Sequence, residues 1–252
     1  MTDFTVVVPA RFASTRLPGK PLLDIAGKPM IAHVWERAQE AGAGRVIVAT
    51  DDERIRAACE QFGAEVFMTA KDHASGTDRI NEVVAGLSAN DDDVFVNVQG
   101  DEPLMPPENI RQVAELAALA GTDIATLHVP VTLREEFLDP NVVKLVADAE
   151  GRALYFSRAP IPWNRNGERD ENGWPTAFEG AVRHLGIYAY RTNALRRFAA
   201  APSCVLEDME SLEQLRALWM GMTIRTSIAA RIPPRGVDTP EDLVALRGLF
   251  SV

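Results

Sequence analysis

The sequence predicts an α/β protein built on a mixed, mainly parallel sheet. Short runs rich in Val and other β-branched or apolar residues, such as residues 4–8 and 45–50, are typical of strands buried on both faces. Amphipathic segments with helical periodicity lie between these runs, and strand–helix alternation indicates parallel strands with right-handed crossovers. After about residue 141 the pattern changes to half-exposed alternation, which predicts a smaller antiparallel region.

Individual residues in the first half of the chain indicate where the strands and helices of the predicted parallel core begin and end. Pro9 ends the first strand because proline cannot donate a hydrogen bond to a sheet, and Asp51 is placed to cap the second helix. Gly76 or Thr77 should lie near the start of the third helix. The further strands are predicted at 45–50, 64–68, 93–98 and 123–132, and the helices at 30–41, 51–62, 80–87 and 106–119.

The second half begins with two predicted antiparallel strands, 142–146 and 152–156, joined by the turn 148–151. A strand at 183–190, helices at 192–200 and 203–221, a strand at 223–229 and a helix at 241–249 follow. The helix 203–221 should turn Leu212, Leu215, Leu218 and Trp219 inward. We expect one domain, 1–252: a first part to about 132, a second part to about 230, and a returning C-terminal loop and helix.

Composition limits the function classes. The net charge of −10 argues against nucleic-acid or membrane-surface binding, which requires a basic face. Cys59 and Cys204 lack metal-ligand spacing and predict buried, reduced thiols in a cytoplasmic protein. The chain shows no signal peptide and no apolar run long enough to span a membrane.

The loop after the first strand carries three cations, Arg11, Arg16 and Lys20, among small residues. It follows the carboxyl end of a predicted strand, where open α/β sheets bind ligands. Arginine, lysine and closely approaching backbone amides suit a polyphosphate. Neither the GxxxxGK[ST] loop nor the GxGxxG fingerprint is present in this stretch, and a solvated basic loop is the alternative.

A carboxylate follows the fourth strand. Asp101 lies just past this strand, and Gly100 permits close backbone approach. Mg²⁺ is usually held by one or two carboxylates together with substrate phosphate oxygens, so Asp101 is a candidate ligand. Asp238 is the candidate second ligand, because capping of the last helix by Thr239 accounts for the residues after Asp238 but not for Asp238 itself. An ordinary turn is the alternative for the Gly100–Asp101 pair.

Other polar segments keep two interpretations. His73, Ser75 and Arg79 either line a pocket or belong to an ordinary loop and cap. The loop 164–175 is either a lid or a mobile surface loop. For His184, a lone histidine is more often structural than catalytic. On periodicity, Glu210, Glu213 and Gln214 form the solvated side of a helix.

Seven segments together resemble the 3-deoxy-manno-octulosonate (KDO) cytidylyltransferase family. They are ARFASTRLPGKPL (10–22), DHASGTDR (72–79), NVQGDEP (97–103), YFSRAPIPW (155–163), RHLGIYAY (183–190), ESLEQLR (210–216) and GVDTPEDL (236–243). The resemblance runs in order over nearly the whole chain. It implies the three-layer, Rossmann-type fold of nucleotide-diphospho-sugar transferases, with the antiparallel region helping to form a sugar pocket and a homodimer interface. The implied reaction is CTP plus KDO giving CMP-KDO and pyrophosphate, in the cytoplasm, for lipopolysaccharide assembly.

The resemblance also implies residue roles. Arg11, Lys20 and Arg16 would hold the triphosphate, and Asp101 and Asp238 would hold Mg²⁺; Arg11, Lys20, Asp101 and Asp238 form the predicted catalytic set. The CTP-binding set is Pro9, Ala10, Arg11, Arg16, Lys20, His73, Ser75, Arg79 and Gln99. The sugar-binding set is Gln99, Arg158, His184, Glu210 and Gln214, with Arg158 as the expected carboxylate partner. Here the resemblance replaces the surface interpretation of Glu210 and Gln214, whereas Glu213 stays structural.

Three alternatives stay open. A cytidylyltransferase for an 8-amino KDO analogue would retain the same motifs, whereas one for a sialic acid is expected to lack YFSRAPIP and RHLGIY. A CTP-binding protein without catalysis is expected to have lost metal carboxylates or phosphate cations, yet Arg11, Lys20, Asp101 and Asp238 are all present. A nucleic-acid-binding protein is disfavoured by the acidic charge.

Overall fold

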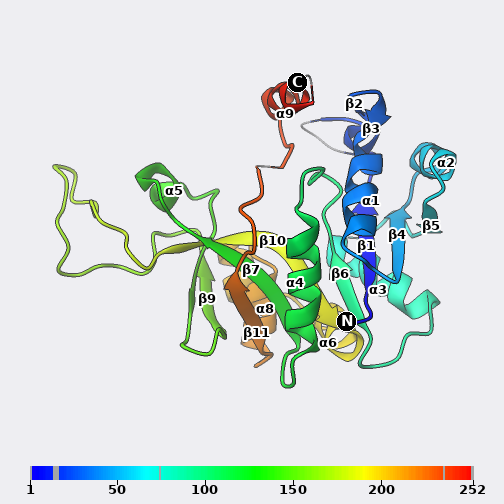
Figure 1. Cartoon of the computed structure of the whole chain (residues 1–252). Coiled ribbons are helices and arrows are strands. Elements are labelled where there is room, and N and C mark those ends of the chain that lie inside the picture. Colours follow the sequence, from blue (N-terminus) through cyan, green and yellow to red (C-terminus); the bar gives the residue numbers. More distant parts are fainter. Residues whose placement is uncertain (1, 14–16, 74, 235, 251–252) are drawn as a thin grey trace.

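A computed structural model describes residues 2–13, 17–73, 75–234 and 236–250. A nine-stranded sheet has the order β11-β7-β10-β6-β1-β4-β5, with β8 and β9 attached through β10 (Figure 1). The strands are β1 (Thr5–Ala10), β4 (Arg45–Thr50), β5 (Glu65–Met68), β6 (Val94–Asn97), β7 (Ile124–Pro130), β8 (Lys144–Ala147), β9 (Ala153–Ser157), β10 (Val182–Arg191) and β11 (Ile224–Ile228). β2 (Asp24–Ile25) and β3 (Lys28–Pro29) pair separately.

The pairing directions confirm a mixed, mainly parallel sheet. β1 pairs in parallel with β4 and β6, β4 with β5, and β11 with β7. β10 is antiparallel to both β6 and β7, so it joins two parallel groups. β8 and β9 form the predicted antiparallel hairpin, and β8 also pairs with the start of β10.

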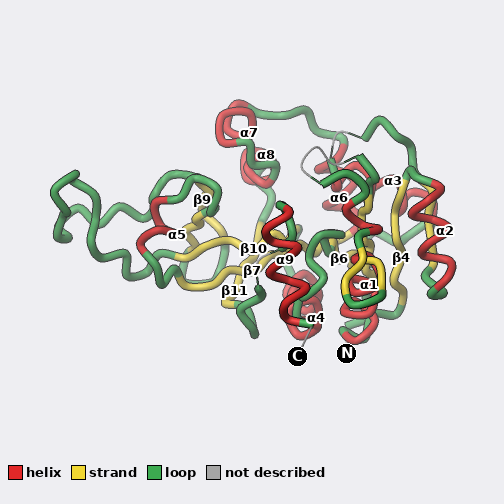
Figure 2. Tube along the Cα trace, turned by 90° about the horizontal axis from the view of Figure 1, so that it is seen from above, coloured by secondary structure: helices red, strands yellow, loops and turns green. Residues whose placement is uncertain are grey.

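Helices cover both faces and create a three-layer arrangement (Figures 1 and 2). α1 (Met30–Glu40), α2 (Glu53–Gln61) and α4 (Pro107–Ala118) contribute to the apolar core on one face, whereas α3 (Gly76–Gly86), α6 (Thr192–Ala199) and α8 (Gln214–Trp219) contribute to the other. β1 lies between the two cores, which explains its central run of valines: Val6 and Val8 enter the first core and Val7 enters the second. The remaining helices are η1 (Lys20–Leu22), α5 (Arg134–Leu138), α7 (Val205–Glu210) and α9 (Pro240–Leu249).

The C-terminal segment returns to the N-terminal part of the fold (Figure 1). Leu243 and Leu246 of α9 share a small apolar cluster with Ile25, Met30 and Leu17. Thr239 caps α9 and forms a reciprocal capping box with Asp242, as the sequence predicts. This packing brings residue 238 from the end of the chain to the loop after β1.

Several local predictions were wrong. The predicted helix 203–221 is two short helices, α7 and α8, because Ser211 adopts a left-handed conformation with φ 51° between them. Trp219 is 62% exposed and therefore does not belong to an inward face. Asp52 rather than Asp51 caps α2. Ser75 caps α3, so Gly76 and Thr77 do lie at the start of this helix, but the helix begins before the predicted residue 80. Among the described residues, no helix combines the length and apolar character required to cross a membrane.

Gly100 carries a stability prediction. A Cβ built at this position lies 2.9 Å from the Pro9 carbonyl oxygen, closer than real Cβ contacts allow. We expect Gly100→Ala to lower the free energy of unfolding by about 1–3 kcal/mol, because backbone must move to relieve the overlap. Thermal and urea unfolding would measure the change. Gly248→Ala in α9 is the control, since nothing lies within 4 Å of its Cβ; an equal effect in both variants would contradict the close-approach explanation.

Candidate nucleotide and acceptor sites

A cavity of ≈ 370 Å³ opens at the carboxyl ends of β1 and β6. We call it the basic cavity. It brings together ten of the eleven residues that the sequence predicts for CTP or metal binding. Its lining is Pro9, Ala10, Arg11, Ala13, Lys20, Pro21, His73, Ser75, Gly76, Arg79, Gln99, Gly100, Asp101 and Asp238. Arg16, also predicted here, lies outside the described residues.

Lys20 joins the two predicted metal carboxylates. Its Nζ lies 2.8 Å from Oδ2 of Asp101 and 3.1 Å from Oδ1 of Asp238, and its side chain is only 12% exposed. The left-handed Gly19, φ 67°, turns the chain into η1 and so presents Lys20. The loops of the two aspartates are also joined by backbone, because Val237 N–H donates to the Asp101 carbonyl at 3.0 Å. Two carboxylates distant in sequence therefore converge on one cation.

Glu102 adds a third carboxyl group beside this centre. Burial, followed by the negative charges of Asp101 and Asp238, raises the pKa of Glu102 to about 8. Glu102 is therefore largely protonated at neutral pH. Two carboxylates facing a phosphate-sized basic cavity match the ligand set that Mg²⁺ prefers, so the residues fit this ion. The described residues hold no cluster of three or more His, Cys, Asp or Glu side chains with metal-binding geometry.

The start of α3 forms another wall of the basic cavity. The Ser75 hydroxyl accepts from the Asp78 N–H, and the Asp78 carboxylate accepts from the Ser75 N–H in return. His73 contacts the Glu82 carboxylate through Nε2. Arg79 is buried and contacts Thr69 and Asp51, the latter at 3.5 Å, so its guanidinium is held in place before any ligand binds. This wall combines a helix N-terminus with fixed cationic and polar groups, which favours an anion.

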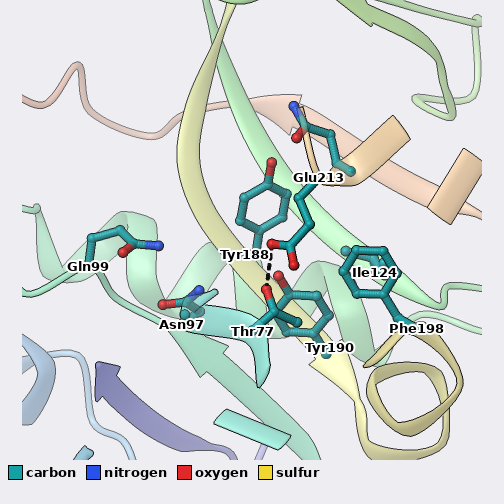
Figure 3. Close-up of a pocket in the computed structure, with 10 residues that line it drawn as sticks. Thr77, Asn97, Gln99, Ile124, Tyr188, Tyr190, Phe198 and Glu213 are labelled. Carbon is teal, nitrogen blue, oxygen red and sulfur yellow. Dashed lines mark hydrogen bonds between the residues drawn. The ribbon is translucent and has the colours of Figure 1, made fainter. Parts of the chain in front are cut away.

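A second cavity, of ≈ 120 Å³, adjoins the first and shares Gly76 and Gln99 with it (Figure 3). We call it the tyrosine cavity. Thr77 donates a hydrogen bond to Oε2 of Glu213 at 2.8 Å across it. Oδ1 of Asn97 is buried without a hydrogen-bond partner among the described residues. The lining is Gly76, Thr77, Asn97, Gln99, Ile124, Tyr188, Tyr190, Phe198, Glu213 and Gln214.

The predicted sugar-binding residues divide into two groups. Gln99 and Gln214 line the tyrosine cavity. The described lining of either cavity does not include Arg158, His184 or Glu210.

Arg158 and Glu210 hold the backbone around the break between α7 and α8. The Arg158 guanidinium donates to the carbonyls of Pro140, Glu210 and Ser211 at 2.9, 2.6 and 3.2 Å. The Glu210 carboxylate accepts from the Ser157 hydroxyl and the Arg158 N–H at 2.7 and 2.9 Å. In this structure both side chains therefore fix the segment that leads to Glu213 and Gln214, and their predicted roles as sugar ligands stay predictions.

Sequence reasoning missed several residues of the tyrosine cavity. Glu213 was interpreted as structural, because helical periodicity gave no sign that the chain breaks at Ser211 and turns Glu213 inward. Asn97 had a visible signal, since it is a polar residue in an otherwise apolar strand. Tyr188 and Tyr190 also had one, because residues two apart share a face of a strand.

His184 lies beside the tyrosine cavity on β10. Its Nε2 is 2.8 Å from the Thr126 hydroxyl, and its ring packs against Phe156 and Tyr188. Burial and then the neighbouring His128 lower the pKa of His184 to about 3. The unfolded chain, with an ordinary histidine pKa near 6.5, therefore binds the proton first as pH falls.

A pH prediction follows for His184. Its stabilising contribution is present above about pH 6.5 and is lost as pH falls toward 3, because only the unfolded state takes up the proton in that window. We expect His184→Gln to flatten the acid dependence of the unfolding free energy by on the order of a few kcal/mol. Urea unfolding at several pH values would measure it. His73→Gln is the control, because it keeps His184 and should keep the wild-type difference.

Comparisons with known proteins agree with this geometry. A family model described as cytidylyltransferase matches residues 5–224. The chain is 51% identical, over all of both chains, to 3-deoxy-manno-octulosonate cytidylyltransferase of Pasteurella multocida. It is 55% identical to the protein of the same name from Pectobacterium carotovorum, with 98% of each chain covered.

Solved structures give the same result. One titled the structure of CMP:2-keto-3-deoxy-manno-octonic acid synthetase complexed with CTP superposes with a TM-score of 0.89, at 42% identity over 99% of both chains. A 4-diphosphocytidyl-2C-methyl-D-erythritol synthase, with a TM-score of 0.64 and 16% identity over 100% of this chain and 99% of its own, shares the fold alone.

The sheet, its basic cavity and these matches define a nucleotidyltransferase of the cytidylyltransferase class. Within that class, the chain belongs to the 3-deoxy-manno-octulosonate cytidylyltransferase family.

Proposed function

We propose that this protein transfers CMP from CTP to the anomeric hydroxyl of KDO, giving CMP-KDO and pyrophosphate with Mg²⁺ as cofactor. The single observation that carries the proposal is the pair of adjoining cavities that share Gly76 and Gln99. One is lined by cations and carboxylates that suit a metal-bound triphosphate, and the other by amides, hydroxyls and a carboxylate that suit a polyhydroxylated acceptor.

In the basic cavity, Arg11 and Lys20 would contact the triphosphate and offset the charge that develops on the departing pyrophosphate. Asp101 and Asp238 would hold Mg²⁺ beside the phosphates. When bound, the ion would supply positive charge that lowers the pKa of the acceptor hydroxyl, so no separate side-chain base is required. His73, Ser75 and Arg79, with the backbone at Pro9 and Ala10, would face the ribose and cytosine; this set is drawn from the family resemblance.

In the tyrosine cavity, Gln99 and Gln214 would bond acceptor hydroxyls, and Glu213 and Asn97 extend the predicted set. The unpartnered Oδ1 of Asn97 is an acceptor without a donor, and a sugar hydroxyl would supply one. The acceptor oxygen would attack the α-phosphorus in line, forming a new P–O bond as the bond to the β-phosphate breaks. Arg158, His184 and Glu210 remain the proposed further acceptor contacts.

The proposal extends to the cellular setting. CMP-KDO would supply lipopolysaccharide assembly in the cytoplasm, and the protein would act as a homodimer. The family resemblance supports these finer statements, and the antiparallel region with β8 and β9 is the proposed dimer surface.

Pyrophosphate release by the pure protein tests the activity. CTP, UTP, ATP and GTP would each be offered with Mg²⁺, and KDO, its 8-amino analogue and N-acetylneuraminate would be offered in turn. We expect release only with CTP and KDO, because the cavity must read the cytosine edge by its hydrogen-bond pattern. Release with the 8-amino analogue or N-acetylneuraminate instead would retain the reaction and change the acceptor. CTP binding without release for any sugar would favour a non-catalytic protein.

A further inference from the structure

A buried threonine occupies the irregular part of β10. Leu185 pairs with Leu127 of β7, but the next pair is Tyr188 with Thr126, so Gly186 and Ile187 have no counterpart on β7. Such a bulge leaves carbonyl groups outside the regular ladder. The Thr126 hydroxyl is 2.8 Å from the Ile187 carbonyl oxygen and 3.1 Å from that of Leu185, and Thr126 is fully buried.

The same hydroxyl is 2.8 Å from Nε2 of His184. A hydroxyl has one proton, and carbonyl oxygens only accept. The hydroxyl proton is therefore directed to the bulge carbonyls, and the hydrogen of the third contact must come from Nε2. This assigns His184 as the neutral Nε2–H tautomer, in which Nδ1 carries the lone pair and can accept a hydrogen bond.

The lowered pKa of His184, caused by burial and His128, keeps the ring neutral at neutral pH. Among the described residues no hydrogen bond to Nδ1 of His184 is formed. An accepting nitrogen matches a hydroxyl donor, which a polyhydroxylated acceptor provides.

Thr126 is also connected to the tyrosine cavity through its strand partner. Tyr188, its direct partner across the strands, lines the tyrosine cavity, and its ring lies 5.2 Å from that of His184. His184 pairs with His128 and Tyr188 pairs with Thr126; these β7 residues are two apart, so His184 and Tyr188 lie on the same face of the sheet. One buried hydroxyl thus organises the strand segment that supplies both side chains.

We propose that Thr126 is a positioning residue of the acceptor site, whose hydroxyl holds the β10 bulge and sets His184 in the tautomer that accepts through Nδ1. The inference deepens the proposed function and, for its acceptor role, rests on it.

The test compares Thr126→Val, Thr126→Ser and, as a matched control, Thr226→Val. Thr226 contacts His128 at 2.8 Å on the neighbouring strand and is buried to a similar extent. ¹⁵N-histidine NMR of the full chain is tractable with four histidines, and it distinguishes protonated from unprotonated ring nitrogens. We expect His184 in the wild type and in Thr126→Ser to show a protonated Nε2, and in Thr126→Val to lose this pattern.

The kinetic arm measures pyrophosphate release. Thr126→Val is expected to raise KM for KDO about tenfold, the effect of losing roughly one buried hydrogen bond, while KM for CTP stays at the wild-type value. Thr126→Ser should recover most of the loss, and Thr226→Val should leave the KDO KM unchanged.

Two results would overturn the inference: a protonated Nδ1 on His184 in the wild type, or Thr126→Val matching Thr226→Val in both tautomer pattern and KDO KM. The wild-type spectrum requires no variant, so poor folding of Thr126→Val would not prevent a decision. Absence of turnover with every acidic sugar would count against the proposed function, while the spectra would still decide whether Thr126 orders His184.

Discussion

Asp101→Asn is expected to reduce turnover by about a hundredfold or more while the fold is retained. The side chain is 36% exposed and makes its ion pair with Lys20, so asparagine fits the same space. The loss has an electrostatic cause: one of the two carboxylate charges proposed to hold Mg²⁺ disappears, and charge stabilisation of this kind contributes several kcal/mol to phosphoryl transfer. Steady-state pyrophosphate release with CTP and KDO would measure it, beside a Mg²⁺ titration.

Asp92→Asn is the matched control for this change. Asp92 is also an aspartate in an ion pair, with Arg191, but its side chain is 90% exposed and lies away from the basic cavity lining. The Asp92→Asn variant should keep wild-type turnover. Near-normal activity in Asp101→Asn, with circular dichroism showing a folded protein, would remove Asp101 from the metal site.

Lys20→Met is expected to produce the second large effect, a loss of turnover of about 10²–10³-fold. The ammonium is nearly enclosed and contacts Asp101 and Asp238 at 2.8 and 3.1 Å. Its removal leaves these two carboxylates without their shared cation and takes away a proposed phosphate contact. Methionine keeps the length and apolar part of the side chain, so the change isolates the charge. CTP affinity by calorimetry and turnover would be measured together.

Lys28→Met provides the comparison for Lys20. Lys28 is 53% exposed on its side chain and pairs with Glu36 outside the basic cavity, and an exposed ion pair contributes about 0–1 kcal/mol. We expect the Lys28→Met substitution to leave turnover unchanged. If Lys20→Met and Lys28→Met behaved alike, the ammonium of Lys20 would have no special part in the reaction.

The basic cavity shows how far local sequence reached. Arg11, Lys20 and Asp101 follow buried strands, and the carboxyl ends of parallel strands meet at one edge of a sheet. That rule, applied to β1 and β6, was sufficient to group them. Asp238 was identified because capping of the last helix accounts for the residues that follow it but gives Asp238 itself no role. The structure confirms the capping box of Thr239 and Asp242.

The tyrosine cavity shows where local sequence failed. Glu213 enters it because Ser211 adopts a left-handed conformation and splits a segment whose periodicity indicated one helix. Arg158, which the family resemblance predicts to be a carboxylate partner, donates in this structure to three backbone carbonyls from distant segments, a contact that its own sequence neighbourhood does not indicate, and its ligand role stays a prediction. Such contacts depend on the partners that the fold brings near, and neither propensity nor charge encodes them.

The sequence by itself determined the α/β class, the order of the main strands and helices along the chain, the phosphate-suited loop and the family. These depend on short-range patterns of burial, capping and charge, which each segment carries in its own residues. Only the tertiary structure decided the strand order in space, the return of Asp238 to Lys20, and the bulge at which Thr126 meets His184. The physical reason is that hydrogen bonds and ion pairs between residues far apart in the chain form only after the sheet has fixed their positions.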